Sequence, residues 1–164
     1  MMAAAMLSGA VSADSSSSSS AVLTQHNIPL NLAVEIASGA VAACAANKYS
    51  VSAAVVDRGG VLRALLRADE AGIHTADAAR QKAYTSASSR QATSAMVKSI
   101  QQNPDAAQLV AIDGFLVLAG GVPIKLSSTN ETIGAIGVGG APGGHLDEAC
   151  ALAALAQVQA KLQH

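Results

Sequence analysis

The stretch SVSAAVVDRGGVLRALL, residues 50–66, has the pattern of two short strands joined by a tight turn. Its two arms, Ser50 to Val56 and Val61 to Leu66, are rich in aliphatic and β-branched side chains, which favour strands. Between them, Asp57-Arg58-Gly59-Gly60 supplies glycine where a turn needs a positive φ angle. The stretch therefore predicts a β-hairpin, which makes its two strands antiparallel neighbours in a sheet.

The rest of the chain adds further hairpin-linked strands and several Ala-rich helices. A Rossmann fold would instead need helices that alternate with single strands. We therefore expect one domain of the mixed α/β (α+β) class, with element order αββααβββα and a five-stranded antiparallel sheet flanked by helices. Thr75 and Thr93 are expected to cap the second and third helices. The expected helices are 28–47, 75–88, 93–103 and 146–162, and the strands beyond the hairpin are 115–119, 122–126 and 132–138.

A glycine-rich stretch, GVGGAPGGHLDEACA at residues 137–151, raises the question of nucleotide binding. The dinucleotide-binding pattern GxGxxG needs a third glycine where Pro142 stands, and no GK[ST] occurs in the chain. We therefore expect these glycines to let a central strand run close to another backbone or to a flat ligand. The first turn of the last helix carries Asp147 and Glu148, which suit the helix dipole there.

Composition excludes some classes of partner. The 164 residues carry a net charge of −1, and 13% of them are charged, which leaves no basic surface for nucleic acid. With one Phe, two Tyr and no Trp, a platform for stacking bases is not expected either. No segment has the length and apolarity of a membrane span.

Residues 1–20 are expected to precede the domain, which we place at residues 21–164. The opening MMAAAMLSGAVSA is short and apolar, with Val11 and Ala13 at the small-residue positions of a secretory cleavage site. The run Ser15 to Ser20 is typical of a flexible linker. We expect a signal peptide and a periplasmic or secreted protein; the alternative is an inconsequential tail on a cytoplasmic one.

The two cysteines, Cys44 and Cys150, both fall in Ala-rich helical patterns. In an exported protein they could form one disulfide between the first and last helices. We favour the other interpretation, two buried free thiols that pack as small apolar groups. Without a CxxC pair, neither zinc binding nor dithiol redox chemistry is indicated.

Three blocks resemble, in matching order, the GlcG/HbpS family of haem-binding proteins, which is related to the C-terminal domain of PduO. VVDRGGVLRALLRAD at 55–69 is similar to the family's Asp-x-x-Gly hairpin, and TADAARQKAYTSASSRQATSAM at 75–96 to its Ala-x-x-Lys-Ala-x-Thr helix. GGVPIKL at 120–126 and IGAIGVGGAPGGHLDEACA at 133–151 resemble its Gly-Gly-x-Pro-Ile strand and glycine-rich loop. Together the blocks place the resemblance over residues 30–160.

The resemblance implies a profilin-like fold, a homo-oligomer of up to eight copies, and haem or a related tetrapyrrole as ligand. Storage, sensing or degradation of haem would then be the role. The chain departs from the family at residues 67–71, where RADEA replaces the usual RMDGA, and at His145 within the glycine-rich loop.

Haem iron needs an axial donor such as histidine. His74, just before the second helix, is the first candidate for this metal ligand, and His145 is the second; exposed loop histidines are the alternative for both. Lys82, on the family's recurring lysine, and Arg67 could pair with the haem propionates, and Thr75 adjoins His74. The predicted cofactor-binding residues are therefore His74, Thr75, Arg67, Lys82 and His145. Lower in rank are His26 and His164 near the chain ends, Arg80 and Arg90 as cations, and Tyr84 and Met96, which are expected to pack in the core.

Two other functions fit the residues. An enzyme or accessory protein acting on a small organic acid could use Asp57 or Asp69 as a base and Lys82 or Arg67 to bind the carboxylate. Arg67 with Asp69, or Lys82 with a nearby acid, could instead be structural ion pairs. A purely structural oligomer would have no concave pocket. Whether the chain is an enzyme therefore stays open.

Overall fold

The computed structural model describes residues 21–163, so the predicted signal segment at residues 1–20 lies outside the described part of the chain. No helix of that part is long and apolar enough to cross a membrane. Its helices are α1 (Leu30–Ala46), α2 (Thr75–Ser89), α3 (Thr93–Gln102) and α4 (Gly144–Gln157), with the short 3₁₀ helices η1 (Pro104–Ala111) and η2 (Gln159–Leu162). Its strands are β1 (Ser52–Asp57), β2 (Leu62–Arg67), β3 (Gly121–Lys125) and β4 (Thr132–Gly139).

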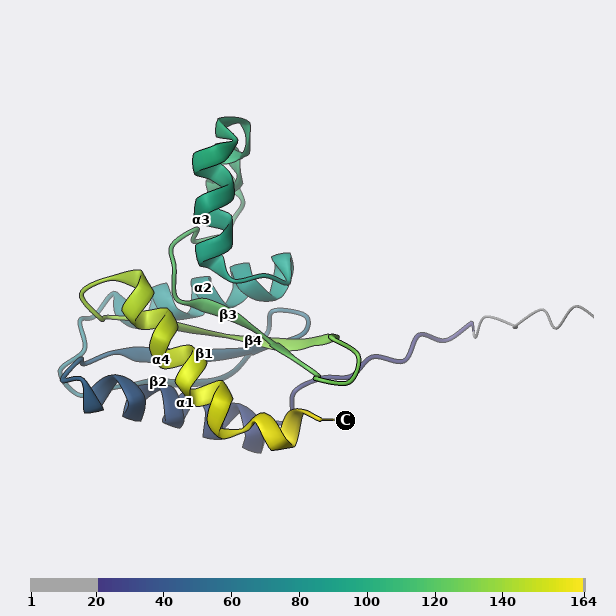
Figure 1. Cartoon of the computed structure of the whole chain (residues 1–164), viewed down its shortest axis with the longest axis horizontal. Coiled ribbons are helices and arrows are strands. Elements are labelled where there is room, and N and C mark those ends of the chain that lie inside the picture. Colours follow the sequence, from purple (N-terminus) through teal and green to yellow (C-terminus); the bar gives the residue numbers. More distant parts are fainter. Residues whose placement is uncertain (1–20, 164) are drawn as a thin grey trace, which may run out of the picture.

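The predicted hairpin is confirmed, and it forms one edge of an antiparallel sheet with strand order β2-β1-β4-β3 (Figure 1). Its turn is held by Asp57, whose Oδ1 accepts hydrogen bonds from the amides of Gly59 at 3.0 Å and Val61 at 2.9 Å. Gly60 takes the positive φ of 82° that the turn requires. The residues that hold the turn therefore all belong to the hairpin itself.

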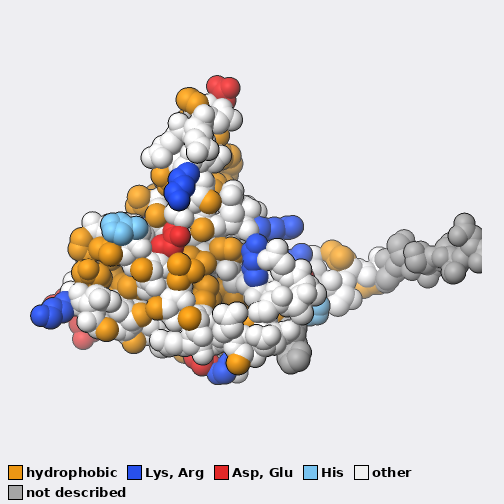
Figure 2. All heavy atoms as spheres, in the orientation of Figure 1, with side chains coloured by type: hydrophobic (Ala, Val, Ile, Leu, Met, Phe, Trp, Pro, Cys, Tyr) orange, Lys and Arg blue, Asp and Glu red, His pale blue; other side chains and the backbone are white. Residues whose placement is uncertain are grey.

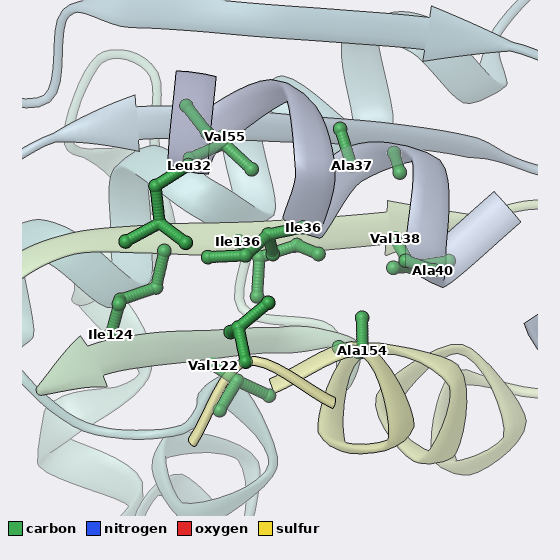
Figure 3. Packing of buried hydrophobic residues seen from close by; sticks show 14 of the residues in the cluster. Leu32, Ile36, Ala37, Ala40, Val55, Val122, Ile124, Ile136, Val138 and Ala154 are labelled. Atoms are coloured by element: carbon green, nitrogen blue, oxygen red, sulfur yellow. The ribbon is translucent and has the colours of Figure 1, made fainter. Parts of the chain in front are cut away.

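Helices cover both faces of the sheet, with α2 on one face and α1 and α4 on the other (Figure 1). The larger core lies on the α1–α4 face, where Ile36, Val55 and Ile136 are fully buried (Figure 3). Their strand neighbours Val56 and Ala135 belong to a smaller cluster with residues of α2. Because alternate strand residues point to opposite faces, β1 and β4 are buried on both sides.

The glycines of β4 bring the sheet close to α2. A Cβ atom at Gly137 would lie 2.0 Å from the carbonyl oxygen of Ala79 and 2.5 Å from the amide nitrogen of Ala83. On β3, a Cβ atom at Gly121 would lie 2.4 Å from the carbonyl oxygen of Lys82. The expectation that these glycines allow close approach to another backbone is confirmed, and that backbone is α2.

The predicted strand Phe115–Ala119 is wrong: the described residues form a four-stranded sheet, and this segment is an irregular connection. The segment lies against α2 instead of pairing with a strand. The amide of Leu116 donates to the Thr85 hydroxyl at 2.8 Å, and the Phe115 ring packs edge-on against Tyr84 with centroids 6.0 Å apart. Its residue types favour a strand, but its backbone and its aromatic ring are held by α2 instead.

Neither Thr75 nor Thr93 caps its helix as predicted; each is the first residue inside it, and His74 and Ala92 take the cap positions. Thr75 Oγ1 lies 2.7 Å from the Ser52 hydroxyl on β1. Thr93 Oγ1 accepts a hydrogen bond from the amide of Gly121 at 2.9 Å. Both threonines therefore tie a helix to the sheet.

The α3–η1 arm, residues 93–111, projects from the body of the domain (Figure 1). Met96 at its base is buried, as expected, but none of the residues of η1 is. Val110 is 62% exposed and Ile112, just beyond η1, 46%, and Figure 2 shows apolar side chains on the surface of the arm. The arm is therefore left uncovered by the rest of the described chain.

Glu131 fastens the segment before α1 to the turn between β3 and β4. One carboxylate oxygen lies 2.8 Å from His26 Nδ1, and the other accepts from the Arg58 guanidinium. The hydrogen bond from His26 and the charges of both partners hold the pKa of Glu131 below its ordinary value of 4.5. The segment is further held by the Asn27 side chain, which accepts from the Arg58 amide at 2.9 Å.

Candidate functional site

A cavity of about 380 Å³ opens between the N-terminal half of α2 and the glycine-rich loop, residues 139–144. Glycine backbone forms much of one wall, and Ala78 and Leu118 add apolar surface. This volume is within the range of small-molecule sites. The concave pocket that a purely structural oligomer would lack is therefore present.

His74 lies at the mouth of this cavity. It occupies the cap position of α2 and is exposed, and its side chain makes no hydrogen bond or ion pair with the described residues. Its ring rests on Gly72, where a Cβ atom would lie 2.9 Å from the imidazole Cε1. The imidazole is therefore free to bind a ligand from the open side.

Thr75 lies beside His74 but is buried, and it lines the cavity wall. Its hydroxyl donates to the carbonyl oxygen of Gly72 at 2.7 Å and also contacts Ser52. These bonds fix the start of α2, and with it the position of His74. Thr75 is thus suited to positioning that imidazole.

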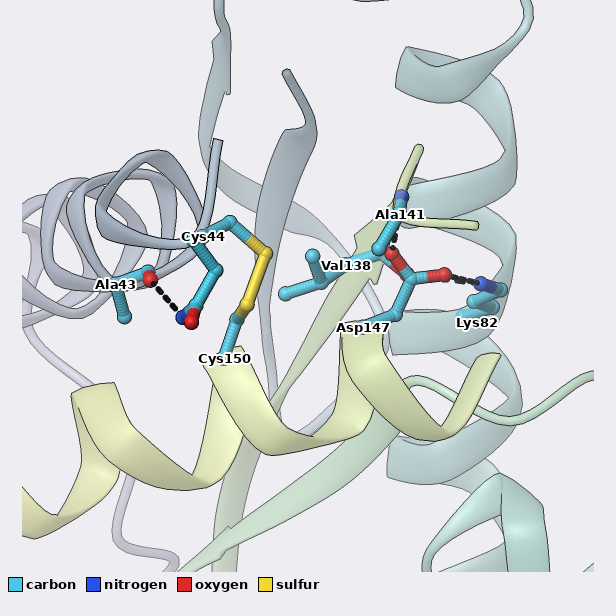
Figure 4. The surroundings of a disulfide bond; sticks show 8 residues. Ala43, Cys44, Lys82, Val138, Ala141, Asp147 and Cys150 are labelled. Carbon is cyan, nitrogen blue, oxygen red and sulfur yellow. Dashed lines mark hydrogen bonds and ion pairs between the residues drawn. A yellow bond between two sulfur atoms is a disulfide. The ribbon is translucent and has the colours of Figure 1, made fainter. Parts of the chain in front are cut away.

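Lys82 and Asp147 form a buried ion pair at the inner end of the cavity (Figure 4). Lys82 Nζ lies 2.8 Å from Asp147 Oδ2 and donates to the Val138 carbonyl oxygen at 2.9 Å. The other oxygen of Asp147 accepts from the amide of Ala141 at 2.9 Å. The pair joins α2, β4, the glycine-rich loop and α4, and it neutralises the ammonium at the cavity wall.

On the same helix, one turn after Asp147, Cys150 forms a disulfide with Cys44 of α1 (Figure 4). The two Cα atoms are 5.4 Å apart, and both cysteines are buried. The favoured prediction of two free thiols is therefore wrong, and the disulfide that we left as the alternative is present. It links α4 to α1, while the ion pair links α4 to α2.

The structure brings together three of the five predicted binding residues and separates two. His74, Thr75 and Lys82 line the cavity, whereas His145 lies in a different recess beside α3. Arg67, at the end of β2, donates a hydrogen bond to the carbonyl oxygen of Ala71 and does not line the cavity.

The lower-ranked candidates have other surroundings in the structure. Asp57 holds the hairpin turn and forms an ion pair with Arg63 at 3.3 Å. Asp69 is exposed outside the cavity. Arg80 pairs with Asp77 within α2 at 3.8 Å, and Arg90 ends that helix with a positive φ of 59°.

Several residues that line the cavity were not predicted as site residues, among them Asp147 and Leu118. Asp147 was noticed only for its place in a helix dipole, and its pairing with Lys82 depends on two residues 65 positions apart. Leu118 was assigned to a strand that does not form. The one usable signal was the expectation that Lys82 could have an acidic partner.

The side chains that line the cavity suit a metal cofactor whose iron is already coordinated by the cofactor's own atoms. No group of three or more His, Cys, Asp or Glu side chains within the described range could hold a bare metal ion. Haem supplies four nitrogen ligands itself and needs an axial donor from the protein. The free imidazole of His74 can be that donor. The glycines of the cavity wall leave room for the edge of a flat ring such as a tetrapyrrole to approach the backbone.

A family model described as haem degrading protein HbpS-like matches residues 28–156. The chain belongs to the HbpS-like family. The predicted resemblance is therefore confirmed. None of the curated proteins compared with the chain matches it significantly.

Solved structures agree with this assignment of the HbpS-like chain. A double mutant of HbpS from Streptomyces reticuli is 36% identical with a TM-score of 0.78, over 90% of this chain and 98% of that one. The Klebsiella pneumoniae protein ORFY is 26% identical with a TM-score of 0.79, over 85% and 96%. A PduOC:haem complex is 20% identical with a TM-score of 0.68, over 79% and 94%, which shows a shared fold.

Proposed function

We propose that this HbpS-like chain binds haem, or a related tetrapyrrole, in the cavity between α2 and the glycine-rich loop, with His74 as the axial ligand of the iron. The family description names haem degradation, and the PduOC relative was solved as a haem complex. The observation that carries the proposal for this chain is the unpartnered imidazole at the mouth of a glycine-walled cavity. Binding is common to haem storage, sensing and degradation, so it is the step to test first.

The residues around His74 have distinct tasks in this proposal. The imidazole supplies the axial nitrogen, and the bonds of Thr75 hold the helix start that carries it. Arg67 is our candidate for pairing with a propionate. Its guanidinium is hydrogen-bonded to the carbonyl oxygen of Ala71, three residues before His74. Lys82 supports the cavity wall through Asp147.

The test is a titration of the full chain with hemin, followed by absorbance in the Soret region. We expect a saturable shift for the wild type and its loss in His74→Ala. His145→Ala is the matched control. Like His74, His145 is exposed, its side chain has no partner among the described residues, and it stands at the start of a helix. The ring of each histidine lies against a glycine two residues earlier. An equal shift in the wild type and His74→Ala would reject His74 as the ligand.

A small organic acid is the second candidate ligand. The ammonium of Lys82 lies at the inner end of the cavity, where a carboxylate would bind it by taking the place of Asp147. Neither Asp57 nor Asp69 lines this cavity, so the base that we expected for such a reaction is not part of it. Binding of small carboxylates without any hemin shift would favour this function.

We also propose that the protein is a homo-oligomer whose contacts include the α3–η1 arm. The arm leaves Val110 and Ile112 exposed, and a short helix needs packing to be stable in water. Light scattering coupled to size exclusion should give a mass above that of one chain, and Val110→Ser with Ile112→Ser should lower it. A wild-type monomer would reject this proposal.

For localisation we propose the periplasm or the exterior of the cell. The Cys44–Cys150 disulfide supports it, because disulfides persist in oxidising compartments. Fractionation of a host that expresses the full chain should place it outside the cytoplasm. Recovery in the cytoplasm with both thiols reduced would favour the alternative.

A further inference from the structure

A second recess, of about 300 Å³, lies where the base of α3 meets the first turns of α4. Its walls carry Ser94 and Lys98 from α3 and His145 and Glu148 from α4. In Figure 2, basic, acidic and histidine side chains gather where the arm meets the body. The recess shares no lining residue with the α2–loop cavity, so the proposed haem site leaves it unexplained.

Glu148 has one satisfied and one unsatisfied carboxylate oxygen. Its Oε1 accepts from the Ser94 hydroxyl at 2.8 Å. Its Oε2 is buried without a hydrogen-bond partner, and no other side-chain nitrogen or oxygen atom in the described part of the chain is in this state. A buried acceptor without a donor is costly, more so when charged. The geometry therefore favours a ligand that donates a proton or carries positive charge here.

The opposite wall offers the complementary charge. The side chain of Lys98 forms no hydrogen bond or ion pair with the described residues, including Glu148. The imidazole of His145 is also unpartnered among the described residues and can donate a second hydrogen bond to an anion. The recess thus presents a free cation, and its lining residue Glu148 has a carboxylate oxygen that lacks a donor beneath the surface.

A bare metal ion fits this arrangement poorly. His145 and Glu148 are two metal-ligating side chains, and no third joins them among the described residues. The ammonium of Lys98 would also repel the ion. A molecule with both an ammonium and a carboxylate uses every free group of the recess.

The remaining surface selects the side chain of such a molecule. Ala149 and Leu152 line the recess, and Leu152 is 51% exposed. A recess at the lower end of ligand-site volumes suits a molecule of one or two residues. We propose that this recess binds a free apolar α-amino acid, with its ammonium at Glu148, its carboxylate at Lys98 and His145, and its side chain on Leu152.

The test is calorimetric titration of the full chain with L-leucine as the probe. We expect saturable binding with a dissociation constant below about 1 mM. The probes 4-methylpentanoate, which lacks the amine, and 3-methylbutylamine, which lacks the carboxylate, should each bind at least about tenfold more weakly, because each loses at least one charged hydrogen bond.

Two variants and a control locate the binding. Glu148→Gln and Lys98→Met should each weaken L-leucine at least about tenfold, whereas Lys48→Met, at an exposed lysine elsewhere, should not. If Glu148→Gln fails to fold, Lys98→Met decides, because Lys98 is exposed. Absence of L-leucine binding, equal binding by Lys98→Met, or binding of Zn²⁺ in place of the amino acid would each overturn the proposal.

Discussion

Replacing Lys82 with methionine should lower the free energy of unfolding by about 3–5 kcal/mol, because it leaves Asp147 as a buried charge without its counter-ion. The two side chains are only 2% and 4% exposed, and their 2.8 Å contact is the ion pair that joins α2 to α4. After the change, Asp147 keeps only the amide of Ala141, and the Val138 carbonyl loses its donor. Methionine retains most of the apolar stem, so the loss reports the charge.

The assay is urea unfolding followed by circular dichroism, with thermal unfolding as a second measure. A loss of about 4 kcal/mol corresponds to a melting point lower by roughly 8–16 °C. The double variant Lys82→Met with Asp147→Asn should cost at least about 1 kcal/mol less than the sum of the single changes.

Lys161→Met is the matched control. Lys161 forms a 2.7 Å ion pair with Glu35, but both side chains are about half exposed, so the change should cost less than about 1 kcal/mol. A loss below about 1 kcal/mol for Lys82→Met, or a double variant whose loss equals the sum of the single losses, would show that the ion pair does not stabilise the fold.

Three other changes test the fold. Gly137→Ala should lower the free energy of unfolding by at least about 1–3 kcal/mol in urea, since its Cβ would lie 2.0 Å from the Ala79 carbonyl oxygen; an unchanged midpoint would mean that α2 can move away freely. Reducing the Cys44–Cys150 disulfide, which closes a separation of 106 residues, should cost about 2–5 kcal/mol, and identical melting with and without reductant would contradict this. The lowered pKa of Glu131 means that its partners stabilise the fold fully above pH 4.5, and that this contribution is lost as the pH falls through the depressed pKa. Glu131→Gln should flatten that acid dependence of the urea midpoint, and an unaltered dependence would exclude the carboxylate as its source.

Local patterns predicted much of the fold. The hairpin at residues 50–66 was predictable because its turn residues and aliphatic arms act on near neighbours. The segment at residues 115–119 was not, because its backbone is held by α2, for example through the hydrogen bond from the Leu116 amide to Thr85, 31 residues away. The prediction that Thr75 caps its helix failed for the same reason. Its hydroxyl contacts Ser52, and that contact exists only in the folded sheet.

The candidate site was predictable in part. A histidine before a helix start indicated His74, and the family pattern indicated Lys82, and both line the cavity. The partner Asp147 and the disulfide needed the position of α4, which sequence spacing does not specify. His145 followed the same local pattern as His74, yet it lines the other recess, whereas Asp147, two residues later on α4, lines the cavity.

The claim that haem occupies the cavity between α2 and the glycine-rich loop is tested most directly by paramagnetic line broadening. Ferric hemin would be added in small steps to the ¹⁵N-labelled chain, and the amide signals followed residue by residue. We expect the amides of residues 72–78 and 139–144 to broaden first, and His74→Ala to abolish the effect. Broadening that begins elsewhere, such as around Tyr84 and Phe115, or that survives His74→Ala unchanged, would contradict it.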